Sequence, residues 1–136
     1  MEVIILDIFK NGNLQNDFFR SWNHLNNEQQ MLVATFISNV TAENLMCGRN
    51  KGQYYNKYNV FHYHIGYREY NNFFTMNCKH DRCKNLVENT YGLTSEGVIY
   101  YIKHDSKIYI LAFGNKHSPF PNNLIFLNIL NSIKNL

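Results

Sequence analysis

Residues 97–114 read GVIYYIKHDSKIYILAFG, and this stretch decides the fold. Two runs rich in β-branched and aromatic residues predict strands over Gly97–Lys103 and Lys107–Gly114. His104-Asp105-Ser106 separates them and forms a tight hairpin loop, because Asp tolerates turn geometry. The hairpin predicts an antiparallel sheet.

Working outward, further segments carry periodic signals. Phe18, Trp22 and Leu25 recur at helical spacing, and a second helical stripe follows from about Glu28. The expected order is a strand at 3–9, helices beginning near residues 16 and 28, a strand at 59–66, the hairpin at 97–114, and an apolar helix from residue 122 or 123. Residues 47–58 are expected to form a loop, and residues 67–95 a loop with a short helix at 84–88.

This order predicts the α+β class. We expect a small antiparallel sheet with two N-terminal helices and a C-terminal helix packed on one face. No linker or repeat divides the chain, so residues 1–136 are expected to form one domain. The C-terminal helix is nearly apolar all round, which is typical of core. It could instead form a surface for a partner.

The composition excludes disorder, since 45% of residues are hydrophobic and 17% charged. The net charge is +3, but Arg49–Lys84 contains seven basic and two acidic residues, so this segment carries about +5. Tyrosines are interleaved with those charges, as expected of a polyanion-binding surface. The alternative is a solvated basic loop. The candidate nucleic-acid contacts are Lys51, Lys57, Lys79, Arg82, Lys103 and Lys116.

Three cysteines, an odd number, do not suggest a disulfide framework, and a reducing compartment is expected. The N-terminal apolar run is too short for a signal peptide or a membrane span. We therefore expect a soluble, cytoplasmic protein without a membrane partner.

The segment Val60-Phe61-His62-Tyr63-His64-Ile65-Gly66 carries the strongest chemical signal. Alternation along a strand sends Phe61 and Ile65 toward the helices and His62 and His64 to the opposite face, about 7 Å apart. On an open sheet face, two imidazoles could serve as general base and general acid. The alternative is a structural pair of histidines.

Cleavage of RNA without a metal or other cofactor needs a base for the 2′-OH, cations for the phosphate, and an acid for the leaving oxygen. His117 follows the last strand and should lie near the same face. The candidate catalytic residues are His62, His64, Arg68 and His117. Lys103 and Lys116 are candidates for stabilising phosphate charge.

A separate, weaker signal is Cys78-Lys79-His80-Asp81-Arg82-Cys83. Cys78, His80 and Cys83 could bind zinc, with Cys47 completing a tetrahedral set. A second ligand pair of the usual spacing is missing, so half-buried thiols are the competing interpretation.

From about Tyr55 onward the sequence resembles the RelE/ParE toxin superfamily, including its YafO- and HigB-like members. The resemblance lies in Val60–Gly66, in Thr94–Tyr101, and in Lys107–Gly114 followed by Asn115-Lys116-His117-Ser118-Pro119-Phe120. It implies a microbial-ribonuclease-like fold, metal-independent endoribonuclease activity on mRNA, usually at the ribosome, and inhibition by a cognate antitoxin. His64 and His117, with His62, are the residues to which it extends.

Residues 71–89 look like an insertion relative to compact members, and the basic residues on the central strands are sparse. Two other functions therefore stay open. One is a non-enzymatic inhibitor on the same scaffold, such as a gyrase poison or a phage or mobile-element protein. The other is a zinc-bearing nucleic-acid-binding module. A homodimer is also compatible with the sequence.

Overall fold

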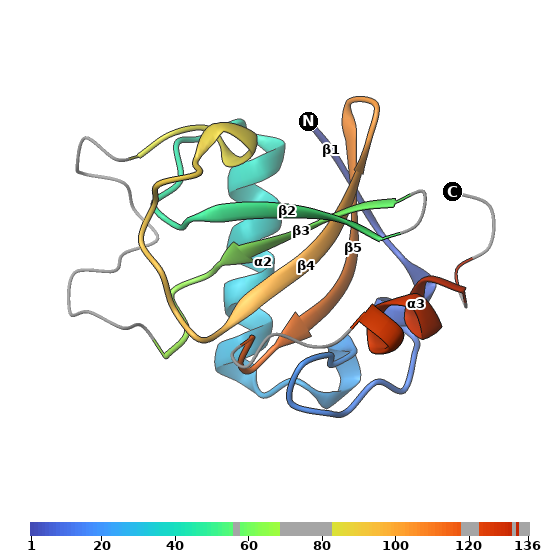
Figure 1. Ribbon diagram of the computed structural model, residues 1–136. Coiled ribbons are helices and arrows are strands. Elements are labelled where there is room, and N and C mark those ends of the chain that lie inside the picture. Colours follow the sequence, from blue (N-terminus) through green and yellow to red (C-terminus); the bar gives the residue numbers. More distant parts are fainter. Residues whose placement is uncertain (56–57, 69–82, 118–122, 132, 134–136) are drawn as a thin grey trace.

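The computed structural model describes residues 1–55, 58–68, 83–117, 123–131 and 133 (Figure 1). The strands are β1 (Glu2–Ile5), β2 (Asn50–Tyr55), β3 (Tyr58–His64), β4 (Val98–His104) and β5 (Lys107–Gly114). The helices are α1 (Asp7–Lys10), α2 (Asn27–Thr41) and α3 (Asn123–Asn131), with short 3-10 turns η1 (Trp22–His24) and η2 (Leu86–Glu88). The α+β class is confirmed.

The strands form one five-stranded sheet in the order β1-β5-β4-β3-β2. The β2–β3, β3–β4 and β4–β5 pairs are antiparallel, whereas β1 pairs parallel to β5. The expectation of a purely antiparallel sheet is therefore wrong at β1. The hairpin between β4 and β5 is confirmed, and its turn residue Asp105 has a φ of 55°, a left-handed conformation that Asp tolerates.

Helix α2 covers one face of the sheet. Its N-terminus has a capping box, in which the Asn26 side chain accepts from the Gln29 backbone N–H and the Gln29 side chain accepts from the Asn26 N–H. Val33, Phe36 and Val40 form its buried stripe. Phe36 packs against Tyr63 of β3 and Tyr101 of β4, with ring centroids 5.3 and 6.1 Å apart. The predicted second helix and its inward face are confirmed.

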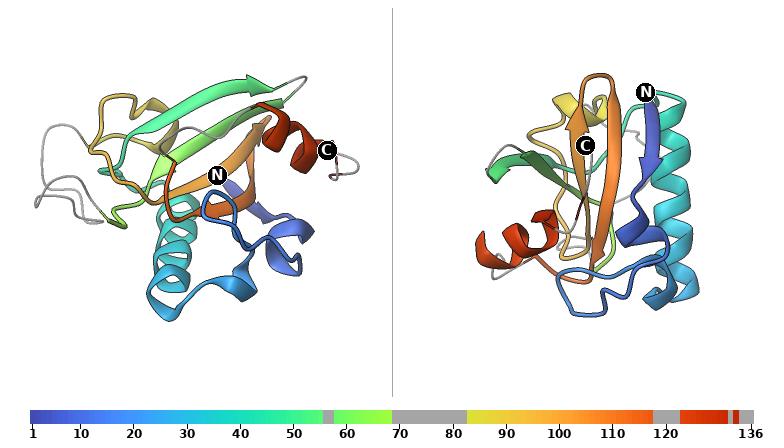
Figure 2. Two further views of the ribbon diagram at one scale, coloured as in Figure 1. Left: turned by 60° about the horizontal axis from the view of Figure 1, so that its bottom comes forward. Right: turned by 90° about the vertical axis from the view of Figure 1, so that its right-hand side faces the viewer.

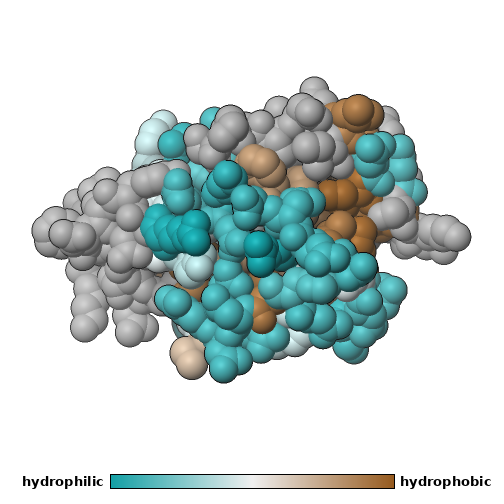
Figure 3. Space-filling model, turned by 90° about the horizontal axis from the view of Figure 1, so that it is seen from below, coloured by the Kyte–Doolittle hydropathy of each residue, from teal (hydrophilic) through white to brown (hydrophobic). Residues whose placement is uncertain are grey.

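The opposite face of the sheet is also covered, so the expectation that all helices pack on one face is wrong. Ile129 and Leu130 of α3 are buried in a second apolar cluster with Val60 and Tyr100. Figure 2 shows α2 and α3 on opposite sides of the sheet. The predicted core role of the C-terminal helix holds for its inner side, while Leu124 remains 65% exposed. On the face seen in Figure 3, the largest apolar area lies on the right-hand side, toward α3, and hydrophilic residues cover most of the rest of the coloured surface.

The first helix expected near residue 16 is not present. Asn16 Oδ1 accepts from the backbone N–H groups of Phe18 and Phe19, which closes a turn, and only η1 is helical. Arg20 then pairs with Phe113 of β5 through two backbone hydrogen bonds. The apolar residues of this segment anchor a loop in both cores: Phe18 packs against the cluster on the α3 side, whereas Leu25 belongs to the cluster on the α2 side.

Two more boundaries differ from the sequence prediction. The first strand ends at Ile5 rather than Phe9, because α1 begins at Asp7 and makes its own helical hydrogen bonds. Residues 47–58, expected as a loop, contain β2. Lys51 and Gly52 are consecutive residues of this edge strand and both are exposed. The strand therefore lacks the alternation of apolar and polar residues from which a strand is predicted. The expected short helix at 84–88 is the 3-10 turn η2. No described helix has the length and apolar character needed to cross a bilayer.

Candidate functional site

Strand β3 places His62 and His64 on the sheet face opposite α2, as alternation predicts. Tyr63 and Ile65 belong to the α2-side core, while Val60 belongs to the other core. The predicted exposure of the imidazoles is wrong, however, since His62 is only 5% and His64 only 3% exposed. Their ring centroids lie 5.3 Å apart.

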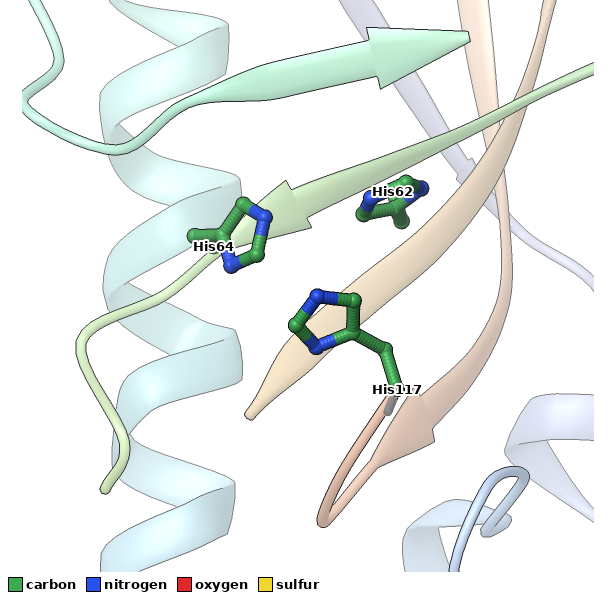
Figure 4. Close-up of side chains that lie close together, drawn as sticks. All are labelled: His62, His64 and His117. Atoms are coloured by element: carbon green, nitrogen blue, oxygen red, sulfur yellow. The ribbon is translucent and has the colours of Figure 1, made fainter. Parts of the chain in front are cut away.

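His117 joins this pair from the segment that follows β5. Its ring centroid lies 5.4 Å from that of His62 and 4.6 Å from that of His64. We call His62, His64 and His117 the three-histidine centre (Figure 4). One ring nitrogen from each of the three lies within 4.8 Å of the others. His117 is half-buried and the other two are buried, so His117 forms the accessible side of the centre.

Backbone contacts hold the segment that carries His117. The N–H of Asn115 donates to the Asp17 carbonyl at 2.8 Å, so the loop before η1 anchors the chain just after β5. The side-chain amides of Asn115 and Gln29 also contact each other at 2.5 Å, in buried surroundings. The position of His117 therefore depends on α2 and on the 14–20 loop, both far away in sequence.

Carbonyl oxygens orient two of the imidazoles. His64 Nδ1 lies 2.7 Å from the Ser95 carbonyl oxygen and His117 Nδ1 lies 3.2 Å from that of Glu96. The Ser95 backbone N–H also lies 3.0 Å from Nδ1 of His64. A ring nitrogen either carries a proton and donates or carries a lone pair and accepts, so only one of the two contacts can be a hydrogen bond. Because the 2.7 Å approach of N to O requires a proton between them, we assign the proton to Nδ1. The lone pair of His64 then resides on Nε2.

The surroundings keep these imidazoles uncharged. Burial, followed by the charges of its histidine neighbours, lowers the pKa of His62 to about 3. Burial also lowers the pKa of His64 to about 4, against a smaller raising effect from its hydrogen bond to Ser95. Burial likewise lowers the pKa of His117, while Glu96 opposes that shift. At neutral pH the centre therefore offers neutral imidazoles with lone pairs.

Two cations act on the centre. Lys51 of β2 is the cross-strand partner of His62, and paired residues share a face of the sheet. The backbone carbonyl of Arg49 accepts a hydrogen bond from the backbone N–H of His64 at 3.0 Å, so the two residues are neighbours. The charges of both cations lower the pKa of His62 and His64. Arg49 Nε is buried and has no hydrogen-bond partner among the described residues. This side of the centre is therefore suited to an anion.

The other predicted cations lie elsewhere. The Arg68 guanidinium lies 5.4 Å from the centroid of the Tyr67 ring, which packs on the α2-side core. Lys103 belongs to the opposite face and donates to the Asp105 carbonyl at the hairpin. Lys116 forms an ion pair with Asp17 at 3.6 Å. Strand alternation places Lys103 on the face opposite the histidines. The Arg68 guanidinium lies over the Tyr67 ring, while the Arg68 backbone carbonyl accepts from the N–H of Glu96, the residue whose carbonyl contacts His117.

Several predicted contacts lie outside the described residues, namely Lys57, Lys79 and Arg82 among the cations and Cys78 and His80 among the zinc ligands. Of the weak zinc set, Cys83 and Cys47 are described. Cys83 is disulfide-bonded, so its sulfur is not a free thiolate for zinc and the expectation of unpaired cysteines is wrong there, whereas Cys47 is a free thiol whose Sγ lies 3.8 Å from that of Cys83. The three-histidine centre is a different set of side chains that could ligate a metal, and the sequence prediction treated them only as acids and bases.

Arg49, Ser95 and Glu96 were not predicted as site residues. Arg49 was counted in the basic segment, whereas Ser95 and Glu96 act through backbone carbonyls, which leave no trace in side-chain chemistry. Only the pairing of β2 with β3 and the path of the chain before β4 bring them to the histidines.

Comparison of this chain with family models, with curated proteins and with solved structures finds no match. The three-histidine centre must therefore be interpreted from its own geometry.

Proposed function

We propose that the protein cleaves RNA at the three-histidine centre, by proton transfer and without a metal ion. The observation that carries the proposal is the convergence of three neutral imidazoles beside Lys51 and Arg49. Proton-transfer groups next to cations are what cleavage of a phosphodiester requires.

The chemistry balances within this set of groups. One imidazole accepts the proton of the ribose 2′-OH, whose oxygen attacks the adjacent phosphorus. The bond from phosphorus to the 5′-oxygen breaks, and an imidazolium returns a proton to that oxygen. The products are a 2′,3′-cyclic phosphate and a 5′-hydroxyl.

The geometry supports distinct roles for the histidines. His64 is a base candidate, because its Nδ1–H is held by Ser95 and its Nε2 carries the lone pair. His117 is the acid candidate, because it is the most accessible of the three and because Glu96 partly offsets the lowering of its pKa by burial. A bound phosphate would raise the pKa of His117 and so favour the imidazolium that donates the proton. His64 is buried and the half-buried His117 ring lies 4.6 Å from it, so a substrate would reach His64 only if the His117 ring moved.

Lys51 and Arg49 support a phosphate-bearing substrate. Lys51 is exposed at the sheet edge, where a polymer can reach it. The partly buried Arg49 has a donor that a phosphate oxygen could satisfy. Phosphate contacts of this kind fix the position of a nucleic acid without reading its sequence.

The wider biological role follows from the sequence resemblance alone. We propose that the chain acts as the toxin of a toxin–antitoxin pair, cleaving mRNA, with a cognate antitoxin as its protein partner. Its activity would then arrest growth.

Inducible expression with 5′-end mapping of cellular mRNA tests the proposal. Wild type should arrest growth and create new 5′-hydroxyl ends, whereas His64→Gln and His117→Gln should not. His104→Gln is the matched control, because His104 is exposed at the β4–β5 hairpin, away from the centre. Circular dichroism of each purified variant checks folding. Toxicity and cleavage that persist in both folded variants would refute the proposal.

A further inference from the structure

The three-histidine centre also has the donor arrangement of a transition-metal site. Two imidazoles project from one face of β3 at positions 62 and 64, and a third arrives from the segment after β5. Three neutral nitrogen donors form a set suited to zinc and its neighbours in the first transition series.

The orientation of the rings fits this chemistry. Metal-bound histidines usually donate their other ring N–H to a carbonyl or carboxylate, which fixes the ring and its tautomer. Ser95 and Glu96 supply such carbonyls to Nδ1 of His64 and His117. Both Nε2 atoms therefore carry the lone pair that a metal requires.

The distances require a modest closure. Zinc–nitrogen bonds of about 2.0 Å at tetrahedral angles place ligand nitrogens about 3.3 Å apart. The nitrogens of the centre lie within 4.8 Å of one another, so one or more must approach by up to about 1.5 Å. His117 is half-buried and lies outside the strands, so its side chain can supply this movement. The two ligands on β3 are already held.

The adjacent cations shape the fourth position. Lys51 and Arg49 disfavour a dication and favour an anionic fourth ligand, such as hydroxide or phosphate, which offsets the charge. Lys51 is exposed, so solvent and salt screen its repulsion.

We infer that His62, His64 and His117 bind a single zinc-class ion and that this ion inhibits the proposed nuclease. A bound metal ion would occupy the imidazole lone pairs that proton transfer needs. Metal binding and RNA cleavage by these histidines therefore exclude each other. The inhibitory part rests on the proposed function, whereas the binding part does not.

Binding is tested with the full chain and Co²⁺, whose visible absorption reports nitrogen coordination. Chelator-treated wild type should bind one Co²⁺ per chain, and excess Zn²⁺ should displace it. His117→Gln should weaken binding at least tenfold, and His104→Gln should leave it unchanged. His117 is the safest ligand to replace because it is half-buried, and His64→Gln provides a second variant if its unfolding curve stays cooperative.

Absence of saturable one-to-one binding, or equal affinity in wild type and His117→Gln, would overturn the metal site. A separate assay with a short RNA should show that Zn²⁺ inhibits cleavage over the concentration range in which it binds, and that chelator restores cleavage. Activation by Zn²⁺ would overturn the inhibitory role. If Co²⁺ binds while RNA stays intact under every condition, the site stands and the proposed nuclease function fails.

Discussion

Lys51 on the edge strand β2 is the direct cross-strand partner of His62 on β3, so a cation lies beside a buried imidazole. Paired residues in antiparallel strands project from the same face. This relationship places an exposed basic residue next to the three-histidine centre.

Lys51→Met should lower kcat/KM for RNA cleavage about tenfold, since one phosphate contact is lost. It should also make the slope of log binding constant against log salt concentration less steep by about 0.7, the value expected for one phosphate contact on single-stranded RNA. Fluorescence anisotropy across a salt series measures this slope. Lys103→Met is the matched control, because Lys103 lies on the opposite face at the hairpin. Equal slopes for both variants and wild type would exclude Lys51 as a phosphate contact.

The stability of the metal-free protein should fall as the solution is acidified. His62 and His64 have folded pKa values of about 3 and about 4, below the usual 6.5. Below pH 6.5 the unfolded chain binds protons that the folded chain does not, so acid favours unfolding. Each histidine lowers the free energy of unfolding by up to about 1.4 kcal/mol per pH unit of acidification, until the pH reaches its pKa in the folded protein.

Urea unfolding in chelator at pH 7, 6, 5 and 4 measures this dependence. His62→Asn should flatten it, and His104→Asn should not. If His62→Asn keeps the wild-type slope, His62 titrates normally in the folded protein and is not buried as described.

The packing of α2 on the sheet depends on Phe36. Its ring is fully buried between α2 and the rings of Tyr63 and Tyr101. Phe36→Ala should therefore destabilise the fold by about 3–5 kcal/mol, through lost transfer energy and a cavity. Met31→Ala is the control, since Met31 is 69% exposed and should change stability by about 0.5 kcal/mol or less. Chemical denaturation compares the two, and a small loss for Phe36→Ala would refute this packing.

Gln29 connects the start of α2 to the histidines. It closes the capping box with Asn26 and contacts Asn115, two residues before His117. Gln29→Ala and Asn26→Ala should each cost about 1 kcal/mol of stability through loss of the cap. Only Gln29→Ala should also weaken Co²⁺ binding, because only Gln29 contacts the segment that carries His117. Titrations of both variants separate the two effects, and equal Co²⁺ affinities would limit Gln29 to its capping role.

Strand alternation and hairpin chemistry are local properties, and the sequence by itself determined them. It placed His62 and His64 on one face of β3, identified α2 by its apolar stripe, and located the turn at Asp105. Neighbouring residues determine these features, so a short stretch of sequence is enough to predict them.

Only the tertiary structure decided what covers each face and which distant residues meet. Lys51 belongs to an edge strand whose first residues, Asn50, Lys51 and Gly52, show no apolar alternation, and its pairing with His62 is a long-range contact. His117 reaches the pair because Asp17 and Gln29 hold the chain after β5. Burial of the imidazoles depends on these long-range contacts. The periodicity of the sequence shows which side chains share a face of a strand, but it does not show which other segments cover that face.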